Sequence, residues 1–418
     1  MHVPNAPRII ARHAQEAVEA GLSDTRVVVI LGARQVGKST LLEQVVAAEE
    51  GRRRILTFDD QPTRAAAIAD PAGFVADLDT PVALDEVQRV PAIITEMKLR
   101  VDRDQAAGQF LLTGSANLLE MTQVKDSLAG RAEYLRLHPF SQGELRGQQE
   151  TFVPKLFAGE FPVISEARAG RKAYAPILAR GGYPEMQTRR PDRRFPWFES
   201  YLEGIMDRDL TTLSEVAERM NVISLLRAIA AVSGNELVIE KLSSALAIPG
   251  TTVRRHTALL ETLFLTRQFP AWSANLLSRT IRKPKVYVTD TGLLAFLVGA
   301  DESRLETDLD IGGIFYETFV ATELQRQIAW QTQRPRLFHF RDQKQREVDI
   351  VMERNDGSIV GVEVKAAASV DRRDFRGLTH LRDKLGDRFK AGALLYTGAN
   401  TVPFGDRLAA VPLSGLWS

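Results

Sequence analysis

Apolar runs and polar breaks alternate along the first third of the chain in a pattern that predicts strands separated by helices. Helical spacing of apolar residues is found over 9–22 and again over 40–46. Strands that alternate with helices favour a parallel sheet, so we expect an α/β fold for residues 1–150. The short apolar runs that predict its buried strands are 27–31, 54–58, 82–84 and 110–113.

The rest of the chain predicts a helical middle and then a second α/β region. Helices are expected at 172–180, 195–213, 236–246 and 253–263, and extended segments at 264–269 and 286–288. A helix, a tight turn, a second helix and a β-ribbon are typical of a winged helix-turn-helix. Further on, the pattern predicts helices at about 313–330 and 370–385, and strands at 347–352, 359–365 and 391–396. The expected segments are an α/β domain (1–150), a helical connector (151–235), a winged helix (236–285) and a second α/β domain (286–418).

The turn after the first predicted strand has the sequence G-x-x-x-x-G-K-S of a phosphate-binding loop. Its glycines allow a tight turn and a close approach to phosphates, which the loop amides and the next helix would bind. Lys38 would then reach the β- and γ-phosphates, and Ser39 would hold Mg²⁺. The alternative is an ordinary glycine turn between a strand and a helix. The predicted ATP-binding residues are Gly32, Ala33, Arg34, Gln35, Val36, Gly37, Lys38, Ser39 and Thr40.

Two adjacent acids follow the strand predicted at 82–84. Asp85 is expected to bind Mg²⁺ through water, and Glu86 to polarise the water that attacks the γ-phosphate. An Asp-Glu pair after a strand can also be a solvated loop. Its combination with an upstream phosphate-binding loop makes the catalytic interpretation specific.

Further catalytic candidates lie after the fourth predicted strand. Ser115, with Asn117 as second choice, is a candidate sensor of the γ-phosphate, or else a cap of a helix expected at 118–122. Arg131 is a candidate arginine finger, acting in cis or across a subunit boundary, or else a surface arginine. Weaker candidates of the same kind are Arg34 and Arg89.

Basic residues gather in segment 251–285, where Glu261 is the only acid. Arg254 and Arg255 fall in the first turns of the predicted recognition helix, where phosphate or base contacts are made. The alternative is a protein–protein module with a basic face. The predicted DNA-binding residues are Arg254, Arg255, Arg267, Arg282 and Lys283.

Four residues of the last segment form a second candidate site. Asp349 and Glu363 lie on neighbouring predicted strands and would bind Mg²⁺ through hard oxygen ligands, with Glu317 completing the metal shell. Lys365 shares a strand face with Glu363 and would position the attacking water. The order Glu, Asp, Glu-x-Lys resembles the restriction-endonuclease-like fold. The alternative is the same fold without catalytic activity, with these residues as surface ion pairs.

Composition narrows the class of protein. A chain of 418 residues with 44% hydrophobic and 26% charged residues is expected to form several soluble globular domains. Its net charge of +1 does not by itself indicate a nucleic-acid partner. The chain has no cysteine, which excludes disulfides and thiolate metal sites and fits the cytoplasm. We find no signal-peptide layout at residues 1–5 and no apolar run of membrane-spanning length, so no membrane association is expected.

Several motifs together resemble a prokaryotic family of AAA-type ATPases. They are Gly-x-Arg-Gln-Val-Gly-Lys-Ser (32–39), Leu-Asp-Glu-Val-Gln (84–88), Leu-Thr-Gly-Ser (112–115) and Ser-Leu-Ala-Gly-Arg (127–131). The similarity continues at 181–185, 285–294 and 347–349 and covers nearly the whole chain. The family joins the ATPase to a C-terminal domain of formerly unknown function, DUF4143. The resemblance implies ATP and Mg²⁺ as cofactors.

The sequence thus supports two main hypotheses. The first is an ATP-hydrolysing DNA-processing protein that binds duplex or branched DNA and carries a Mg²⁺-dependent nuclease domain. The second is an ATP-switched DNA- or protein-binding regulator whose nuclease fold is catalytically inactive. A regulatory ATPase acting on proteins is a third. Arginine-finger chemistry would favour a homo-oligomer, and a monomer with Arg131 acting in cis is the alternative.

Overall fold

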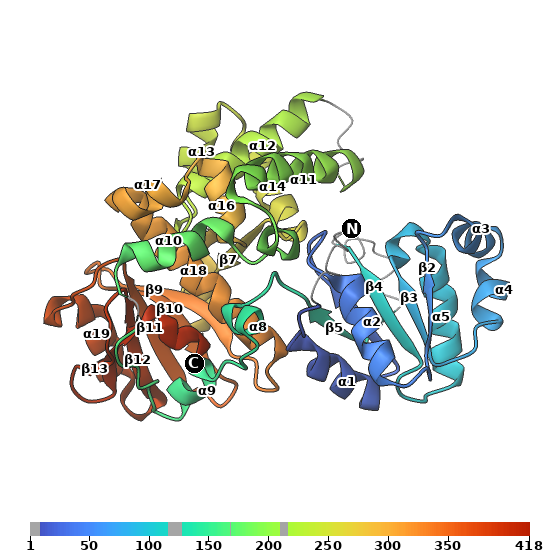
Figure 1. Cartoon of the computed structure of the whole chain (residues 1–418), viewed down its shortest axis with the longest axis horizontal. Coiled ribbons are helices and arrows are strands. Elements are labelled where there is room, and N and C mark those ends of the chain that lie inside the picture. Colours follow the sequence, from blue (N-terminus) through green and yellow to red (C-terminus); the bar gives the residue numbers. More distant parts are fainter. Residues whose placement is uncertain (1–8, 116–127, 168, 210–215) are drawn as a thin grey trace, which may run out of the picture. The chain divides into compact units, whose positions relative to one another are not determined.

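The computed structural model describes residues 9–115, 128–167, 169–209 and 216–418 (Figure 1). Asn117, the helix expected at 118–122 and the end of the helix expected at 195–213 lie outside the described residues. The chain divides into two units, residues 1–149 and 150–418, and each is described by itself. None of the described helices is both long and apolar enough to cross a membrane.

The first unit is built on a five-stranded parallel sheet with the order β2-β3-β4-β1-β5. The strand β4, which carries Thr113, lies between the loop-bearing β1 and the acid-bearing β3. Because all pairs are parallel, the carboxyl ends of the strands meet at one edge, where α/β folds bind ligands. The strands are β1 (Val27–Leu31), β2 (Arg54–Thr57), β3 (Val82–Asp85), β4 (Phe110–Gly114) and β5 (Ala132–Arg136).

Helices flank this sheet (Figure 1). Local capping explains several of their starts. The side chain of Asp60 accepts the Thr63 N–H in α3, and that of Asp70 accepts the Gly73 N–H in α4. Ser141 and Glu144 form a capping box on α8. The helical elements are α1 (Ala14–Asp24), α2 (Lys38–Ala48), α3 (Gln61–Ala69), α4 (Pro71–Ala76), η1 (Val87–Arg89), α5 (Ala92–Arg103) and α8 (Gln142–Arg146).

The second unit begins with a largely helical region. Its aromatic packing centres on Tyr183, which is fully buried, contacts Trp197 and Phe198, and shares a hydrogen bond of 2.9 Å with the Tyr201 hydroxyl. Its elements are α9 (Phe152–Phe157), α10 (Arg171–Arg180), η2 (Pro184–Gln187), η3 (Pro191–Arg193), α11 (Arg194–Asp209) and α12 (Val216–Ala231).

The next elements have the order of a winged helix: helix, strand, two helices, then two strands. Their three strands form an antiparallel sheet with the order β6-β8-β7. Between β7 and β8 the wing carries a short helix, α15. The elements are β6 (Asn235–Glu236), α13 (Ile239–Leu246), α14 (Gly250–Thr262), β7 (Thr266–Phe269), α15 (Leu276–Ile281) and β8 (Lys285–Val288).

A mixed six-stranded sheet forms the rest of the second unit, with the order β13-β14-β12-β11-β10-β9. Helix α19 packs on it over an apolar cluster that includes Phe340, Phe375 and Leu378. The strands are β9 (Arg336–Arg341), β10 (Glu347–Glu353), β11 (Ile359–Lys365), β12 (Phe389–Tyr396), β13 (Val402–Pro403) and β14 (Leu408–Pro412). The helical elements are α16 (Thr291–Val298), α17 (Glu302–Thr307), α18 (Leu309–Trp330), η4 (Arg372–Phe375), α19 (Arg376–Leu385), η5 (Gly386–Arg388) and η6 (Leu413–Trp417).

The predicted architecture of a parallel-sheet P-loop domain, a helical middle and a second α/β region is confirmed. The sequence patterns missed the helices α3, α4, α5, α8, α9, α12, α15, α16 and α17 and the strands β5, β6, β9, β13 and β14. Strand β5 has an intermediate, polar burial pattern, and β13 has only two residues, so neither produces a clear apolar signal.

Candidate functional site

The loop between β1 and α2 has the geometry that binds phosphate. Gly37 has a left-handed backbone (φ 92°), and Lys38 begins α2. The Lys38 ammonium is buried and donates to the carbonyls of Gly32 (3.1 Å) and Ala33 (2.8 Å). A Cβ on Gly32 would lie 2.4 Å from the Leu137 carbonyl oxygen, so this glycine is required for the close packing of the loop.

Asp85, at the end of β3, is the centre of the hydrogen-bond network in the first unit. Its carboxylate accepts from the hydroxyls of Ser39 (2.9 Å), Thr113 (2.5 Å) and Thr57 (3.2 Å). These residues come from α2, β4 and β2, so three elements hold one carboxylate in place beside the phosphate-binding loop. The contact between Ser39 and Asp85 joins the two side chains predicted to share a Mg²⁺ ion.

Glu86 is held next to this carboxylate in an uncommon backbone conformation. Its φ of 60° is left-handed, and such non-glycine positions gather at functional sites. Its N–H donates to the Thr113 hydroxyl (2.9 Å), and its carboxylate accepts from the Gln88 amide. Gln88 also accepts from the Ser115 N–H (3.2 Å). The buried Ser115 hydroxyl has no hydrogen-bond partner within the described part of the chain.

A buried arginine supports the phosphate-binding loop from outside the motif. Arg12 donates to the carbonyls of Val36 (3.2 Å) and His138 (2.5 Å), and its guanidinium lies 3.0 Å from the Glu144 carboxylate. It therefore ties the loop to the segment after β5 and to α8. The sequence analysis missed it, because a single arginine before a helix carries no signal.

The structure corrects the prediction that Arg131 acts as a finger in cis. Arg131 precedes β5, and Ala132 pairs with Val27 at the amino end of β1, so Arg131 lies at the opposite edge of the sheet from the phosphate-binding loop. Its guanidinium pairs with Asp102 at 2.5 and 2.9 Å. Arg89 likewise pairs with Asp59 at 2.6 Å, as a surface arginine does. A role of Arg131 across a subunit boundary stays a prediction.

In the second unit, the predicted metal ligands surround a lysine that the sequence analysis had counted with the basic residues of the wing. Lys285, on β8, is buried, and its ammonium lies 2.8 Å from Glu317, 2.7 Å from Glu347 and 3.0 Å from Asp349. The Tyr287 hydroxyl also donates to Glu317 (2.8 Å). We call Lys285 and these three carboxylates the Lys285 cluster.

The pKa shifts of these acids and of Lys285 fit a buried ammonium that is surrounded by carboxyl groups. Burial and the charge of Asp349 raise the pKa of Glu317 to about 8, although Lys285 opposes the rise. The same two causes raise the pKa of Glu363 well above its ordinary value. The surrounding carboxylates raise the pKa of Lys285 against the effect of its burial. The Lys285 ammonium therefore stays charged, and burial favours the protonated forms of Glu317 and Glu363.

Lys365 does not join these carboxylates. Its ammonium lies 2.8 Å from Asp374 on η4, which corrects the prediction that Lys365 would serve the site of Asp349 and Glu363. The donor set of Glu317, Asp349 and Glu363 suits a hard cation, but the Lys285 ammonium already lies against two of them. Over the described ranges, no group of three or more acidic or histidine side chains has a geometry that could hold a metal ion.

The predicted DNA-binding residues lie on α14, β7 and the wing, and acids from other elements pair with three of them. Glu218 lies 2.5 Å from Arg255, and Glu261 lies 2.9 Å from Arg267. Glu240 lies 3.8 Å from Arg254, whose side chain is 64% exposed. This surface contains a groove of about 360 Å³, whose charged lining residues are Glu240, Arg254, Arg282 and Lys283.

Comparison with known families assigns the first unit. Residues 24–146 match the AAA domain family, whose members are P-loop ATPases. The first unit is an AAA domain. Residues 171–304 match the domain of unknown function DUF8612, and residues 312–416 match the domain of unknown function DUF4143. The predicted pairing of an AAA domain with a DUF4143 domain is thus confirmed.

Relatives align with both units. The uncharacterized proteins Rv2008c of Mycobacterium tuberculosis and Mb2031c of Mycobacterium bovis are each 29% identical over 411 residues, which cover 96% of this chain and 83% of each relative. Among solved structures, the Thermotoga maritima RuvB Holliday junction branch migration motor is 14% identical (TM-score 0.30, covering 62% of this chain and 89% of RuvB). AMPPCP-bound DnaA from Aquifex aeolicus is also 14% identical (TM-score 0.28, covering 59% of this chain and 85% of DnaA).

Proposed function

We propose that this AAA-domain protein hydrolyses ATP, that its nucleotide state controls DNA binding by the second unit, and that its DUF4143 domain has a restriction-endonuclease-like fold without metal-dependent nuclease activity. The observation that carries the first part is the convergence of Lys38, Ser39 and Asp85 at the carboxyl edge of the sheet. The Lys285 cluster is the observation behind the third part, the lack of metal-dependent nuclease activity.

The residues of the AAA domain fit Mg²⁺ and ATP. Ser39 and Asp85 supply hard oxygen atoms on neighbouring elements, which suits Mg²⁺. When bound, Mg²⁺ neutralises charge on the β- and γ-phosphates. Lys38 is placed to exchange its two carbonyl partners for phosphate oxygens, and the N–H groups at the start of α2 orient the same anion.

Glu86 is the group that polarises water in this proposal. Its backbone is fixed by Thr113 of β4 and its carboxylate by Gln88 of η1, so its position depends on both of these side chains. Gln88 also connects Glu86 to Ser115. The buried hydroxyl of Ser115, which has no hydrogen-bond partner among the described residues, supports a role in sensing the γ-phosphate, because buried hydroxyls are normally satisfied.

DNA binding is assigned to the winged helix of the second unit. Support comes from the order of its elements and from the groove that contains Arg254, Arg282 and Lys283. The ion pairs of Arg255 and Arg267 leave these two residues less able to contact phosphate. We therefore expect Arg254, Arg282 and Lys283 to provide most of the phosphate contacts.

The Lys285 cluster argues against metal-dependent cleavage. A nuclease of this class needs a divalent cation to activate water and to stabilise the transferring phosphoryl group. In this chain the buried ammonium of Lys285 already contacts Glu317 and Asp349, two of the predicted ligands. A divalent cation would have to displace the buried Lys285 ammonium, which lies within 3.0 Å of the carboxyl groups of Glu317, Glu347 and Asp349. We therefore favour the regulator hypothesis over the nuclease hypothesis.

Paired assays test the proposal. ATP hydrolysis is measured for wild type, Lys38→Ala and Glu86→Gln, and plasmid cleavage is measured with Mg²⁺ or Mn²⁺. We expect hydrolysis in wild type only, retained ATP binding in Glu86→Gln, and no cleavage that requires Asp349. Hydrolysis that survives in both variants would contradict the ATPase assignment. Cleavage that is lost in Asp349→Ala would contradict the assignment of the Lys285 cluster.

A further inference from the structure

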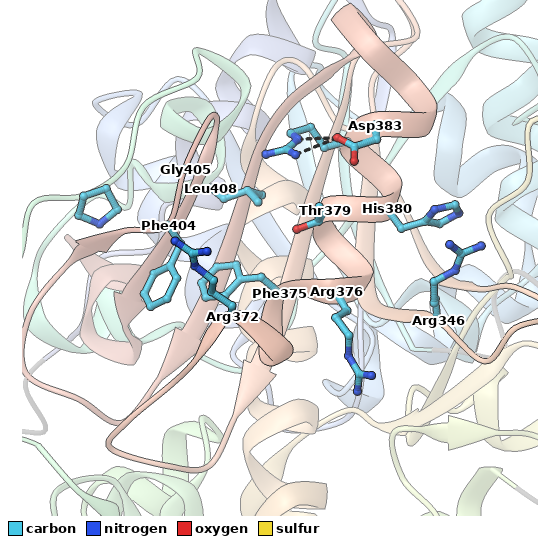
Figure 2. Close-up of a pocket in the computed structure, with 12 residues that line it drawn as sticks. Arg346, Arg372, Phe375, Arg376, Thr379, His380, Asp383, Phe404, Gly405 and Leu408 are labelled. Atoms are coloured by element: carbon cyan, nitrogen blue, oxygen red, sulfur yellow. Dashed lines mark hydrogen bonds and ion pairs between the residues drawn. The ribbon is translucent and has the colours of Figure 1, made fainter.

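A basic groove lies along α19, away from the winged helix. It encloses about 860 Å³, a size within the range of about 300–1,000 Å³ usual for ligand sites. Figure 2 shows basic side chains spread along it, with two phenylalanine rings at one end. Its charged lining residues are Arg346, Arg372, Arg376, Arg382 and Asp383.

Two of these arginines are available for a ligand. Arg346 pairs with Asp342, and Arg382 pairs with Asp383. Arg372 and Arg376 are exposed, and no described acidic side chain lies within ion-pair distance of either guanidinium. Guanidinium groups bind phosphate oxygens through two parallel hydrogen bonds, so this pair suits a phosphodiester.

The aromatic end of the groove adds a second kind of contact. The Phe404 ring stacks on the buried Phe375 ring with centroids 4.4 Å apart and an interplanar angle of 19°. The hairpin that carries Phe404 is held by its N–H bond to the Leu408 carbonyl (2.8 Å). A stacked, anchored ring beside arginines provides a platform for an unpaired base, which a duplex does not offer.

The loop that carries Arg346 also contacts the wing. The Arg282 guanidinium donates to the Arg341 carbonyl at the end of β9 (2.8 Å). Arg346, which lines the α19 groove, lies at the other end of the loop that joins β9 to β10. One loop therefore contacts the wing at one end and lines the α19 groove at the other.

From these contacts we propose that the α19 groove binds single-stranded DNA, with Arg372 and Arg376 on the phosphates and a base stacked on Phe404. This inference rests on the proposed DNA binding of the second unit. It adds a strand-specific site to the duplex-binding winged helix. An acidic protein would match the arginines but would make no use of the half-buried Phe404 ring that lines the groove.

The test measures binding of a fluorescent oligothymidylate of twelve nucleotides, and of a duplex of twelve base pairs, to the full chain. In Arg372→Gln/Arg376→Gln, the affinity for the single strand should fall at least tenfold. The plot of log affinity against log salt should become shallower by about 1.4, since each phosphate contact on a single strand contributes about 0.7 to its slope. The matched control Arg373→Gln/Arg388→Gln removes the same charge from exposed arginines outside the groove. It should change single-strand affinity less than twofold.

Further arms separate the possible causes. Phe404→Leu should weaken the single strand by about tenfold, the loss expected for one stacked base, and should leave the salt slope unchanged. Duplex binding should stay within twofold in all these variants and fall in Arg254→Gln/Lys283→Gln, so failure of this site and failure of the winged helix are distinguishable. Equal losses in the groove and control pairs would overturn the inference. The inference would also be overturned if polyglutamate displaced the oligonucleotide at an equal concentration of carboxylate groups, or if free thymidine monophosphate did so at an equal concentration of phosphate groups.

Discussion

Replacing Lys285 by methionine removes the only cation that contacts Glu317, Glu347 and Asp349 within the described ranges. Methionine has a similar length and no charge. Loss of one partner of a buried ion pair leaves uncompensated charge and costs about 3–5 kcal/mol. For a unit of this size each kcal/mol lowers the melting temperature by about 2–4 °C, so we expect a fall of roughly 10 °C.

Tryptophan fluorescence makes this measurement specific to the second unit, because all four tryptophans, at 197, 272, 330 and 417, lie in it. Lys283→Met is the matched control, since Lys283 is exposed two residues earlier and surface changes usually stay within about 0.5 kcal/mol. A destabilisation of Lys285→Met that equals the control would refute the account of the cluster. A gain in stability would refute it as well, because it would show that the carboxylates do not need the ammonium.

The remaining predictions concern the AAA domain, the pH dependence and metal ions. Thr113→Val leaves the Glu86 N–H without its acceptor, a loss of about 1–3 kcal/mol, so steady-state ATP turnover should fall about tenfold or more while nucleotide affinity, measured with fluorescent ADP, stays within threefold. Arg12→Met removes two bonds to loop-supporting carbonyls and should weaken fluorescent ADP binding at least fivefold; unchanged binding would contradict its supporting role. The pKa of Glu317 is about 8 in the folded chain, so the folded chain keeps a proton that the unfolded chain releases near 4.5. The free energy of unfolding of the second unit should therefore fall by up to about 1.4 kcal/mol per pH unit as pH rises towards 8. Glu317→Gln should flatten this slope in urea titrations. Mn²⁺ should raise the melting temperature of Lys285→Ala, in which the carboxylates are free to bind it, and should leave the fluorescence melting of wild type unchanged.

Local patterns predicted the AAA domain well, because its chemistry is concentrated in short segments. The glycines of the phosphate-binding loop, the apolar run of β1 and the acids after β3 are each visible within a few residues. The Ser39–Asp85 contact follows from the parallel sheet, which brings the ends of distant strands to one edge. Thr113 was also within reach, since a hydroxyl interrupts the apolar β4 one residue before its end.

The interior of the second unit was predicted less well, because its ion pairs join residues far apart in the sequence. Lys285 was counted with the basic wing, yet it contacts Glu347 and Asp349, which lie more than sixty positions further along the chain. Arg279, another basic residue of segment 251–285, is mostly buried: it pairs with Glu353 at 2.5 and 3.0 Å and packs on Trp272. The charge of a lysine or arginine is visible in a sequence, whereas its burial is set by the tertiary fold.

The most direct test of the central claim is the duplex DNA affinity of the hydrolysis-deficient Glu86→Gln variant in three nucleotide states. It is measured without nucleotide, with Mg·ATP and with Mg·ADP, beside Lys38→Ala as the control that does not bind nucleotide productively. The account predicts that ATP and ADP states differ at least fivefold in affinity, the lower end of typical allosteric coupling, and that Lys38→Ala shows no such difference. Equal affinity in all three states would contradict the claim that ATP controls DNA binding.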